Sequence, residues 1–123
     1  MCGIAGYLSK EETIDKNKFE KMVDIVAHRG PDDRGFYYDK AVALGHRRLS
    51  IIDLSKEGHQ PFIYKDKYVI VFNGEIYNYV ELREQLEQLG YVFRTKTDTE
   101  VLIAMYDCYG KNCVTMLNGM WSL

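Results

Sequence analysis

The second residue of the chain, Cys2, is the first candidate for chemistry. Removal of the initiator Met1 would make Cys2 the N-terminal residue, which then carries a thiol and a free α-amine together. An α-amine titrates near ~8, and a nucleophile paired with its own N-terminal amine is one way in which enzymes activate weak nucleophiles. The alternative is a small buried residue at the start of a strand.

Two charged side chains are candidates for ligand binding. Arg48 is flanked by apolar residues, and its two-pronged guanidinium suits a carboxylate. The alternative is a surface ion pair. Asp98 falls in the first turn of an expected helix, where it either favours the helix dipole or holds a substrate ammonium group. Sequence spacing leaves both readings open for each residue.

The pair Asn73-Gly74 follows the strongest strand signal of the chain, the run of β-branched and aromatic residues at 68–72. Asn and Gly tolerate the backbone angles of a tight turn. Such a turn offers a side-chain amide and a backbone N–H together, as an oxyanion hole requires. A plain Asn-Gly hairpin is the alternative, and the helical pattern that follows disfavours it.

The elements that must position these residues follow from hydrophobic periodicity and from capping and turn residues. The loop at 28–35 is densely charged and contains Gly and Pro, which makes it either a solvated connection or a loop beside a site. An irregular loop is expected at 54–67, and Thr97 and Glu100 have the spacing of a capping box. The pattern predicts strands at 2–8, 36–38, 41–46, 68–72, 91–95 and 119–123, and helices at 16–27, 80–89, 99–109 and 113–117.

Composition limits the class of protein. A chain of 123 residues, 46% hydrophobic and 28% charged, is expected to form one globular domain. Its net charge of −2 argues against a nucleic-acid or anionic-membrane binder. It has neither an apolar run of about 20 residues nor a signal peptide pattern. Three cysteines without a C-x-x-C pair favour a reducing, cytoplasmic compartment over a disulfide framework.

Five segments taken together resemble one family. They are MCGIAG at 1–6, HRGPD at 28–32, RLSIID at 48–53, FNGEIYN at 72–78 and TDTE at 97–100. In this order they resemble the class II glutamine amidotransferase domain, with the strongest likeness to the glutaminase domains of glutamine-hydrolysing asparagine synthetases. The resemblance implies the α+β fold of N-terminal-nucleophile hydrolases, a four-layer α/β/β/α sandwich of antiparallel sheets.

The resemblance also implies roles for the residues singled out above. Cys2 would attack the side-chain amide of L-glutamine, releasing ammonia and leaving a glutamyl thioester, while Asn73 and Gly74 would form the oxyanion hole. The remaining implied positions would bind the glutamine α-carboxylate (Arg48), lie near its α-amino group (Glu75 and Asp98) or form the pocket wall (Leu49, Ser50, Ile51 and Ile52).

Two features differ from the family pattern. Met1 is present in the sequence, and a retained Met1 would leave Cys2 without its amine. The family's domain is longer, so we expect residues 1–123 to be one C-terminally truncated glutamine amidotransferase type 2 domain that is inactive alone. A separate synthetase domain, which would use ATP and Mg and receive the ammonia, is expected outside it; no cofactor or metal is expected in this domain. A homodimer is left open.

Two other functions remain open at this stage. The first is the glutaminase domain of another class II amidotransferase, one that makes amino sugars or modifies polysaccharides. The second is a non-catalytic module that binds glutamine without turning it over. Ammonia release from glutamine separates the second from an enzyme.

Overall fold

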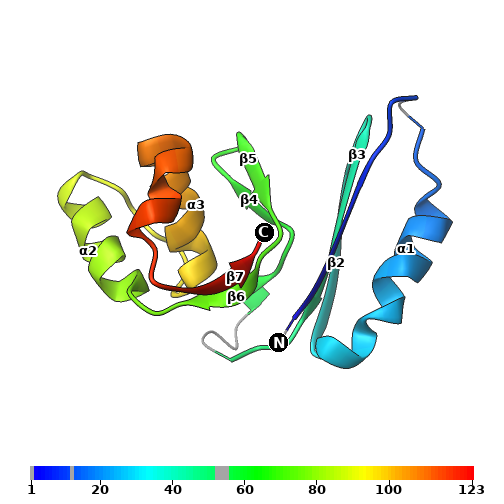
Figure 1. Ribbon diagram of the computed structural model, residues 1–123, viewed down its shortest axis with the longest axis horizontal. Helices are drawn as coiled ribbons and strands as arrows, with labels where there is room; N and C mark the ends of the chain where they lie inside the picture. The colour runs from blue at the N-terminus through cyan, green and yellow to red at the C-terminus, as the bar shows by residue number, and fades with distance from the viewer. Residues whose placement is uncertain (1, 12, 52–55) are drawn as a thin grey trace.

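The computed structural model describes residues 2–11, 13–51 and 56–123, and its elements are arranged in four layers (Figure 1). One helix covers a three-stranded sheet, two small sheets form the next layer, and two further helices cover them on the far side. Every strand pair is antiparallel. The mixed architecture of helices and antiparallel sheets expected from the sequence is therefore confirmed in the described part of the chain.

The three-stranded sheet consists of β1 (Gly3–Leu8), β2 (Asp33–Asp39) and β3 (Val42–Arg48), with β3 in the centre. β2 begins earlier than the hydrophobic pattern predicted, because its charged first residues still pair with β3. Gly3 lies opposite Arg47 across β1 and β3. This register brings the beginning of the chain beside the end of β3.

Helix α1 (Lys16–Ile25) packs on this sheet through Phe19 and Val23, which form a small apolar cluster with Ala43. Its first turn is capped by Asp15, whose carboxylate accepts a hydrogen bond from the helix N-terminus. The helix ends earlier than the predicted 16–27. Met22 on this helix is exposed, because only a narrow stripe of the helix meets the sheet.

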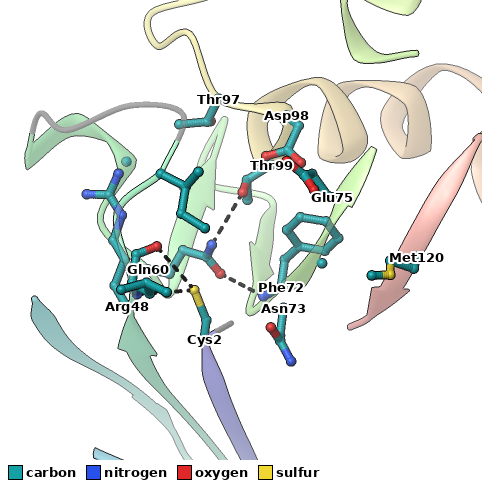
Figure 2. A pocket seen from close by; sticks show the side chains of 14 residues that line it. Cys2, Arg48, Gln60, Phe72, Asn73, Glu75, Thr97, Asp98, Thr99 and Met120 are labelled. Carbon is teal, nitrogen blue, oxygen red and sulfur yellow. Dashed lines mark hydrogen bonds between the residues drawn. The ribbon is translucent and has the colours of Figure 1, made fainter. Parts of the chain in front are cut away.

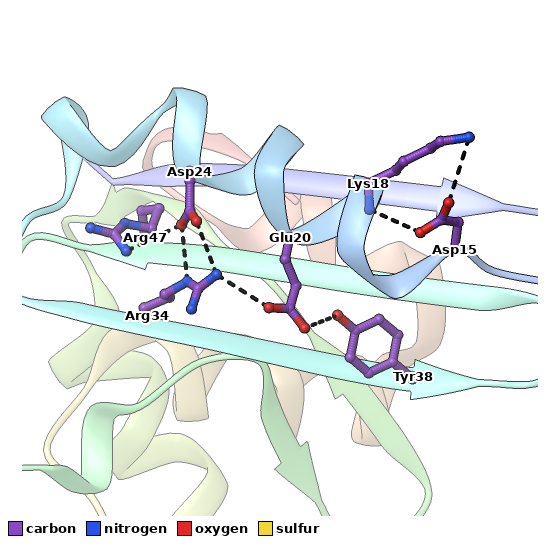
Figure 3. A network of polar contacts seen from close by, with 7 residues as sticks. All are labelled: Asp15, Lys18, Glu20, Asp24, Arg34, Tyr38 and Arg47. Atoms are coloured by element: carbon purple, nitrogen blue, oxygen red, sulfur yellow. Dashed lines mark hydrogen bonds and ion pairs between the residues drawn. The ribbon is translucent and has the colours of Figure 1, made fainter.

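A polar network also ties α1 to the sheet (Figure 3). Asp24 on the helix accepts hydrogen bonds from both Nε and Nη2 of Arg34 at 2.9 Å, and it lies 3.6 Å from Nη1 of Arg47. Glu20, one turn earlier, is bonded to Arg34 and to the Tyr38 hydroxyl. The two-pronged geometry sets the position of the helix along the sheet, although partly exposed ion pairs add little stability individually.

The first of the two small sheets pairs β4 (Phe62–Tyr64) with β5 (Tyr68–Ile70). The prediction of an irregular loop at 54–67 was wrong in the described part, because residues 62–64 form a strand. The hairpin turns at Lys65 and Asp66, whose φ angles are 53° and 51°. Asn-Gly pairs are the usual signal for such a turn, and this hairpin lacks one.

The second small sheet pairs β6 (Asn73–Ile76) with β7 (Gly119–Ser122). The predicted strand at 68–72 therefore ends at residue 70, and residues 71–72 separate β5 from β6. Asn73 and Gly74 were expected in a tight turn, and that expectation was wrong because they are the first two residues of β6. The β7 strand was predicted.

Helices α2 (Tyr79–Gln88) and α3 (Asp98–Tyr109) cover the small sheets. Thr97 caps α3 as predicted, with its hydroxyl accepting a hydrogen bond from the Glu100 N–H at 3.2 Å. The Glu100 carboxylate instead accepts from the main chain at residues 94 and 95. The predicted strand at 91–95 is absent from these described residues because this side chain takes its hydrogen bonds.

Three short 3₁₀ helices complete the described elements. They are η1 (Ala27–Arg29), η2 (Lys56–Gly58) and η3 (Gly110–Met116). The last occupies the region where a short helix was predicted at 113–117. Among the described helices, none combines the length and apolar character needed to cross a bilayer.

His46 on β3 connects the two sheet layers. Its side chain is 1% exposed, and its Nε2 donates to the carbonyl oxygen of Phe72 at 3.1 Å. Burial lowers the pKa of His46 to about 4, because the charged imidazolium would lose its hydration. The ring is therefore neutral in the folded protein at physiological pH.

This buried histidine predicts an acid-sensitive fold. Below pH 6.5 the unfolded chain protonates His46, whereas the folded chain stays neutral down to about pH 4. The free energy of unfolding should consequently fall by about 3 kcal/mol as the pH drops through this window. Urea unfolding of the parent and of His46→Gln at a series of pH values measures this change in the free energy of unfolding. Equal pH slopes in the two proteins would contradict the prediction.

Candidate active site

A cavity of about 160 Å³ lies where the three-stranded sheet faces the small sheets (Figure 2). It is small beside the ~300–1,000 Å³ of pockets for drug-sized ligands, and suits a molecule the size of an amino acid. Every segment singled out in the sequence except the loop at 28–32 contributes to the lining, and three residues outside the segments join them. The lining residues are Cys2, Arg48, Leu49, Ile51, Gly58, Gln60, Phe72, Asn73, Gly74, Glu75, Thr97, Asp98, Thr99 and Met120.

Cys2 lies immediately before β1, and its Sγ reaches the cavity (Figure 2). The Leu49 N–H donates to Sγ at 3.3 Å, and Sγ lies 3.7 Å from the Leu49 carbonyl oxygen. These contacts follow from the β1–β3 register, which places the residue before Gly3 beside the residues after β3. The thiol is half-buried and points towards the space between the sheets.

The charged loop at 28–32 supports both Cys2 and the end of β3. Arg29 Nε donates to the Cys2 carbonyl oxygen at 3.1 Å. The Asp32 N–H donates to the Arg48 carbonyl oxygen at 2.9 Å, while its carboxylate accepts from the Ser50 N–H at 2.8 Å. Of the two readings of this loop, the structure favours the one that places it beside a site.

The ladder between β6 and β7 determines where the Gly74 N–H points. The Tyr77 N–H is bonded to the Asn118 carbonyl oxygen at 2.7 Å, and bonded pairs alternate along an antiparallel ladder. The N–H groups of Gly74 and Ile76 therefore lie on the edge away from β7. Consistently, the Ile76 N–H donates to Asp98 Oδ2 at 3.1 Å. The Gly74 N–H thus remains on the edge that borders the cavity.

Gly74 has no side chain where it crosses β7. A Cβ at this position would overlap the main chain of Met120 and Trp121. The glycine is therefore required by close strand packing, and not by the turn that the sequence predicted. Asn73 lines the cavity beside it, on the same side as Cys2 (Figure 2).

Arg48 ends β3 with its side chain in the cavity wall and is 8% exposed. Its guanidinium packs against Gly58, where a Cβ would come within 2.8 Å of Cζ. The close approach of this loop encloses the cation, and enclosure from water strengthens its attraction for an anion. The structure thus places a buried positive charge at one side of the cavity (Figure 2).

Two carboxylates lie on the side away from Arg48 in Figure 2. Asp98 begins α3 and is 6% exposed, whereas Glu75 on β6 is exposed. Burial raises the pKa of Asp98, and the nearby Glu75 raises it further, while the hydrogen bond from Ile76 acts against both. A cationic group between the two acids would relieve this cost, since an opposite charge favours the ionised form.

The predicted pocket wall is only partly found in the described residues. Leu49 and Ile51 line the cavity, although Ile51 is 66% exposed. Ser50 is not among the lining residues, and its N–H is taken by Asp32. Ile52 lies outside the described residues, as does Met1.

Several lining residues were not singled out from the sequence. Gln60 and Met120 belong to none of the five segments. Phe72 and Thr99 lie in the segments at 72–78 and 97–100, but neither was given a role at a site. Nδ1 of His59, the residue before Gln60, lies 2.6 Å from Oδ2 of Asp33. The signal available was the Gly58–Pro61 stretch, whose function depends on contacts distant in sequence.

The arrangement brings together a thiol, the Gly74 N–H on a strand edge that borders the cavity, a cation and two acids around one small space. Such a set can bind a zwitterion and attack a carbonyl within reach of the thiol. In the described part of the chain, no group of three or more His, Cys, Asp or Glu residues is placed to hold a metal ion.

Comparison with known proteins agrees with this site. The family model described as glutamine amidotransferase domain matches residues 1–123. The chain is 47% identical to asparagine synthetase [glutamine-hydrolyzing] 1 of Bacillus subtilis, with 99% of the chain and 20% of that protein covered. It is 40% identical to a putative asparagine synthetase [glutamine-hydrolyzing] 2 of Methanocaldococcus jannaschii, with 99% and 27% covered.

A third relative carries a different name. The amidase chyE of Penicillium rubens is 38% identical, with 97% of the chain and 20% of that protein covered. The chain thus spans only about a fifth to a quarter of the length of these curated relatives. The match extends over the whole chain and confirms the resemblance seen in the five sequence segments: the chain belongs to the glutamine amidotransferase domain family.

Proposed function

We propose that this chain is the glutaminase domain of a glutamine-hydrolysing asparagine synthetase. It hydrolyses the side-chain amide of L-glutamine and supplies ammonia for the synthesis of asparagine from aspartate. The observation that carries the proposal is the single cavity shared by Cys2, Arg48, Asn73, Gly74 and Asp98. The names of the relatives that match the whole chain favour asparagine as the product.

The α-amine of Cys2, freed by removal of Met1, is the proposed base. It takes the proton of Sγ as the sulfur adds to the amide carbon of glutamine. The proton then passes to the amide nitrogen, the C–N bond breaks, and ammonia leaves a glutamyl thioester. Water attacks this thioester, breaks the C–S bond and releases glutamate, which returns the thiol and the amine to their starting forms.

The charge that forms during attack is stabilised from β6. As sulfur adds, negative charge collects on the former carbonyl oxygen. The Asn73 side-chain amide and the Gly74 N–H are the proposed donors to this oxygen. Donors that are already in place stabilise the transition state more than the neutral amide, and therefore accelerate the reaction.

Glutamine is held by its charged end. Arg48 binds the α-carboxylate, while Asp98 and Glu75 bind the α-ammonium group. The pairing places an anion beside Arg48 and a cation beside the buried Asp98, and opposite charges attract more strongly where water is excluded. Leu49 and Ile51 contact the aliphatic part of the ligand.

The ammonia is used elsewhere in the full-length protein. We propose a separate synthetase domain that uses ATP and Mg and receives the ammonia, with the glutaminase domain itself needing no cofactor. The described cysteines, Cys2, Cys108 and Cys113, are all free, which fits the reducing cytoplasm as the place of action.

The proposal is tested first at the N-terminus. Full-length protein with Met1 removed should release ammonia from glutamine, and its Cys2 should be alkylated by a glutamine-analogue electrophile. A form extended by one residue should lose both, because the amine has become an amide nitrogen. Cys113 is the internal reference: burial raises its pKa, so it should react slowly in both forms. Equal labelling of Cys2 in the two forms would refute the proposal.

The charged ends of the pocket give a second test. Arg48→Ala and Asp98→Ala should each weaken glutamine binding by about 1.5–3 kcal/mol, because each removes a charge-assisted contact. Calorimetric titration of the full-length variants with glutamine measures the loss. Arg34→Ala and Asp107→Ala, whose ion pairs lie outside the cavity lining, are the matched controls and should bind normally. Unchanged affinity in both cavity variants would exclude this assignment.

The oxyanion donors give a third test. Asn73→Ala should lower kcat for glutamine hydrolysis by about 10²–10³-fold with a smaller effect on KM, as expected for loss of one donor. Steady-state ammonia release, normalised to folded full-length protein, is the measurement. Asn17→Ala, an exposed asparagine on α1, is the control. If Asn73 only shapes the main chain, the yield of folded protein falls while kcat stays near that of the parent.

A further inference from the structure

The peptide groups on either side of Phe72 are held by side chains and not by a strand. Residue 72 lies between β5 and β6, directly before Asn73. Its N–H donates to Gln60 Oε1 at 2.6 Å, and its carbonyl oxygen accepts from His46 Nε2 at 3.1 Å. All three residues are buried. Both polar groups of the Phe72 main chain are therefore satisfied by residues distant in sequence.

Gln60 links this main chain to α3. Its Nε2 donates to the Thr99 hydroxyl at 3.3 Å, while its Oε1 accepts from Phe72 (Figure 2). The orientation of the amide is set by these partners, because the Phe72 N–H needs an acceptor. Thr99 follows Asp98 at the start of α3. The Gln60 side chain therefore connects the main chain just before β6 to the helix that carries the buried Asp98.

His46 holds the other side of Phe72 from β3. A carbonyl oxygen only accepts, so the histidine proton must be on Nε2. The residue lies two positions before Arg48, on the strand that also positions Cys2. The β3 strand thus supports the thiol, the cation and the main chain that leads to Asn73.

We propose that Gln60 and His46 are positioning residues that aim the donors of Asn73 and Gly74 at the oxyanion. The inference rests on the proposed glutaminase function and extends it to residues that carry no step of the chemistry. Peptide groups are planar, so the two contacts fix the planes before and after Phe72. The next plane carries the Gly74 N–H. An error of about 1 Å in such a donor can cost up to about 10²-fold in rate.

Gln60 acts through its hydrogen bonds to the protein and not through a contact with the substrate. It lines the cavity, but its oxygen faces Phe72 and its nitrogen faces Thr99. A residue that bound the substrate directly would affect KM when replaced. A residue that positions oxyanion donors affects kcat, because those donors act mainly in the transition state.

The test compares Gln60→Met with Gln85→Met in the full-length protein. Methionine preserves the volume of the side chain and removes its hydrogen bonds. Gln85 on α2 donates to the Tyr109 hydroxyl at 2.8 Å and lies outside the cavity lining, so it is the matched control. We expect kcat for ammonia release, per folded molecule, to fall about 10- to 100-fold in Gln60→Met, with KM changed less than about 3-fold. Gln85→Met should resemble the parent.

Two variants of His46 test whether a replacement that keeps the hydrogen-bond donor also keeps turnover. His46→Gln retains an N–H donor near the position of Nε2, whereas His46→Leu removes it. The expected order of kcat is parent, then His46→Gln, then His46→Leu, with the last at least about 10-fold below the second. Circular dichroism and Tm report the folded fraction, so that a loss of stability is separated from a loss of turnover.

The outcomes separate this inference from the function on which it rests. A parent protein that releases no ammonia overturns both. A parent that is active while Gln60→Met keeps its kcat, or shows a raised KM with kcat unchanged, overturns the positioning role alone. Equal kcat values in His46→Gln and His46→Leu overturn the positioning role of His46.

Discussion

The antiparallel pairing of β1 with β3 is the constraint on which the candidate site depends. Because Gly3 lies opposite Arg47, the residue before β1 must lie beside the residues that follow β3. The thiol of Cys2 therefore meets the main chain of Leu49, while Arg48 of the same strand enters the cavity wall. A register shift of one residue would move every side chain of β1 to the opposite face and separate the Cys2 thiol from the Arg48 guanidinium.

Polar contacts bridge the region between the layers. One apolar cluster joins α1 to the three-stranded sheet, and a larger one joins the small sheets to α2 and α3. Between them lie buried polar side chains, including His46, Gln60, Arg48 and Asp98. Such groups are costly to bury unless they are bonded. Nε2 of His46, Oε1 of Gln60 and Oδ2 of Asp98 are each bonded to a main-chain group. This requirement makes the space between the layers specific in geometry, as catalysis by preorganised groups demands.

The two buried charged residues of the cavity are also shaped by their enclosure from water. Burial raises the pKa of Asp98, which marks an acid that gains from a cationic neighbour. Arg48 is enclosed by the loop at Gly58, and enclosure from water strengthens the attraction of a cation for an anion. The cavity therefore has a positive and a negative side, which suits a zwitterionic amino acid better than a neutral amide.

The sequence alone predicted the three α-helices, the separate strands of the larger sheet, the cap at Thr97 and the family resemblance, because these follow from local periodicity and from short motifs. It also identified the residue types of the site: a thiol, an amide, a cation and acids. Tertiary structure decided what local patterns do not encode. The Lys65 turn has no Asn-Gly signal, and the expected strand at 91–95 is lost because Glu100 takes its N–H groups. The support given by Gln60 to Phe72 joins residues through a buried contact between layers, and such contacts are selected by packing and not by sequence spacing.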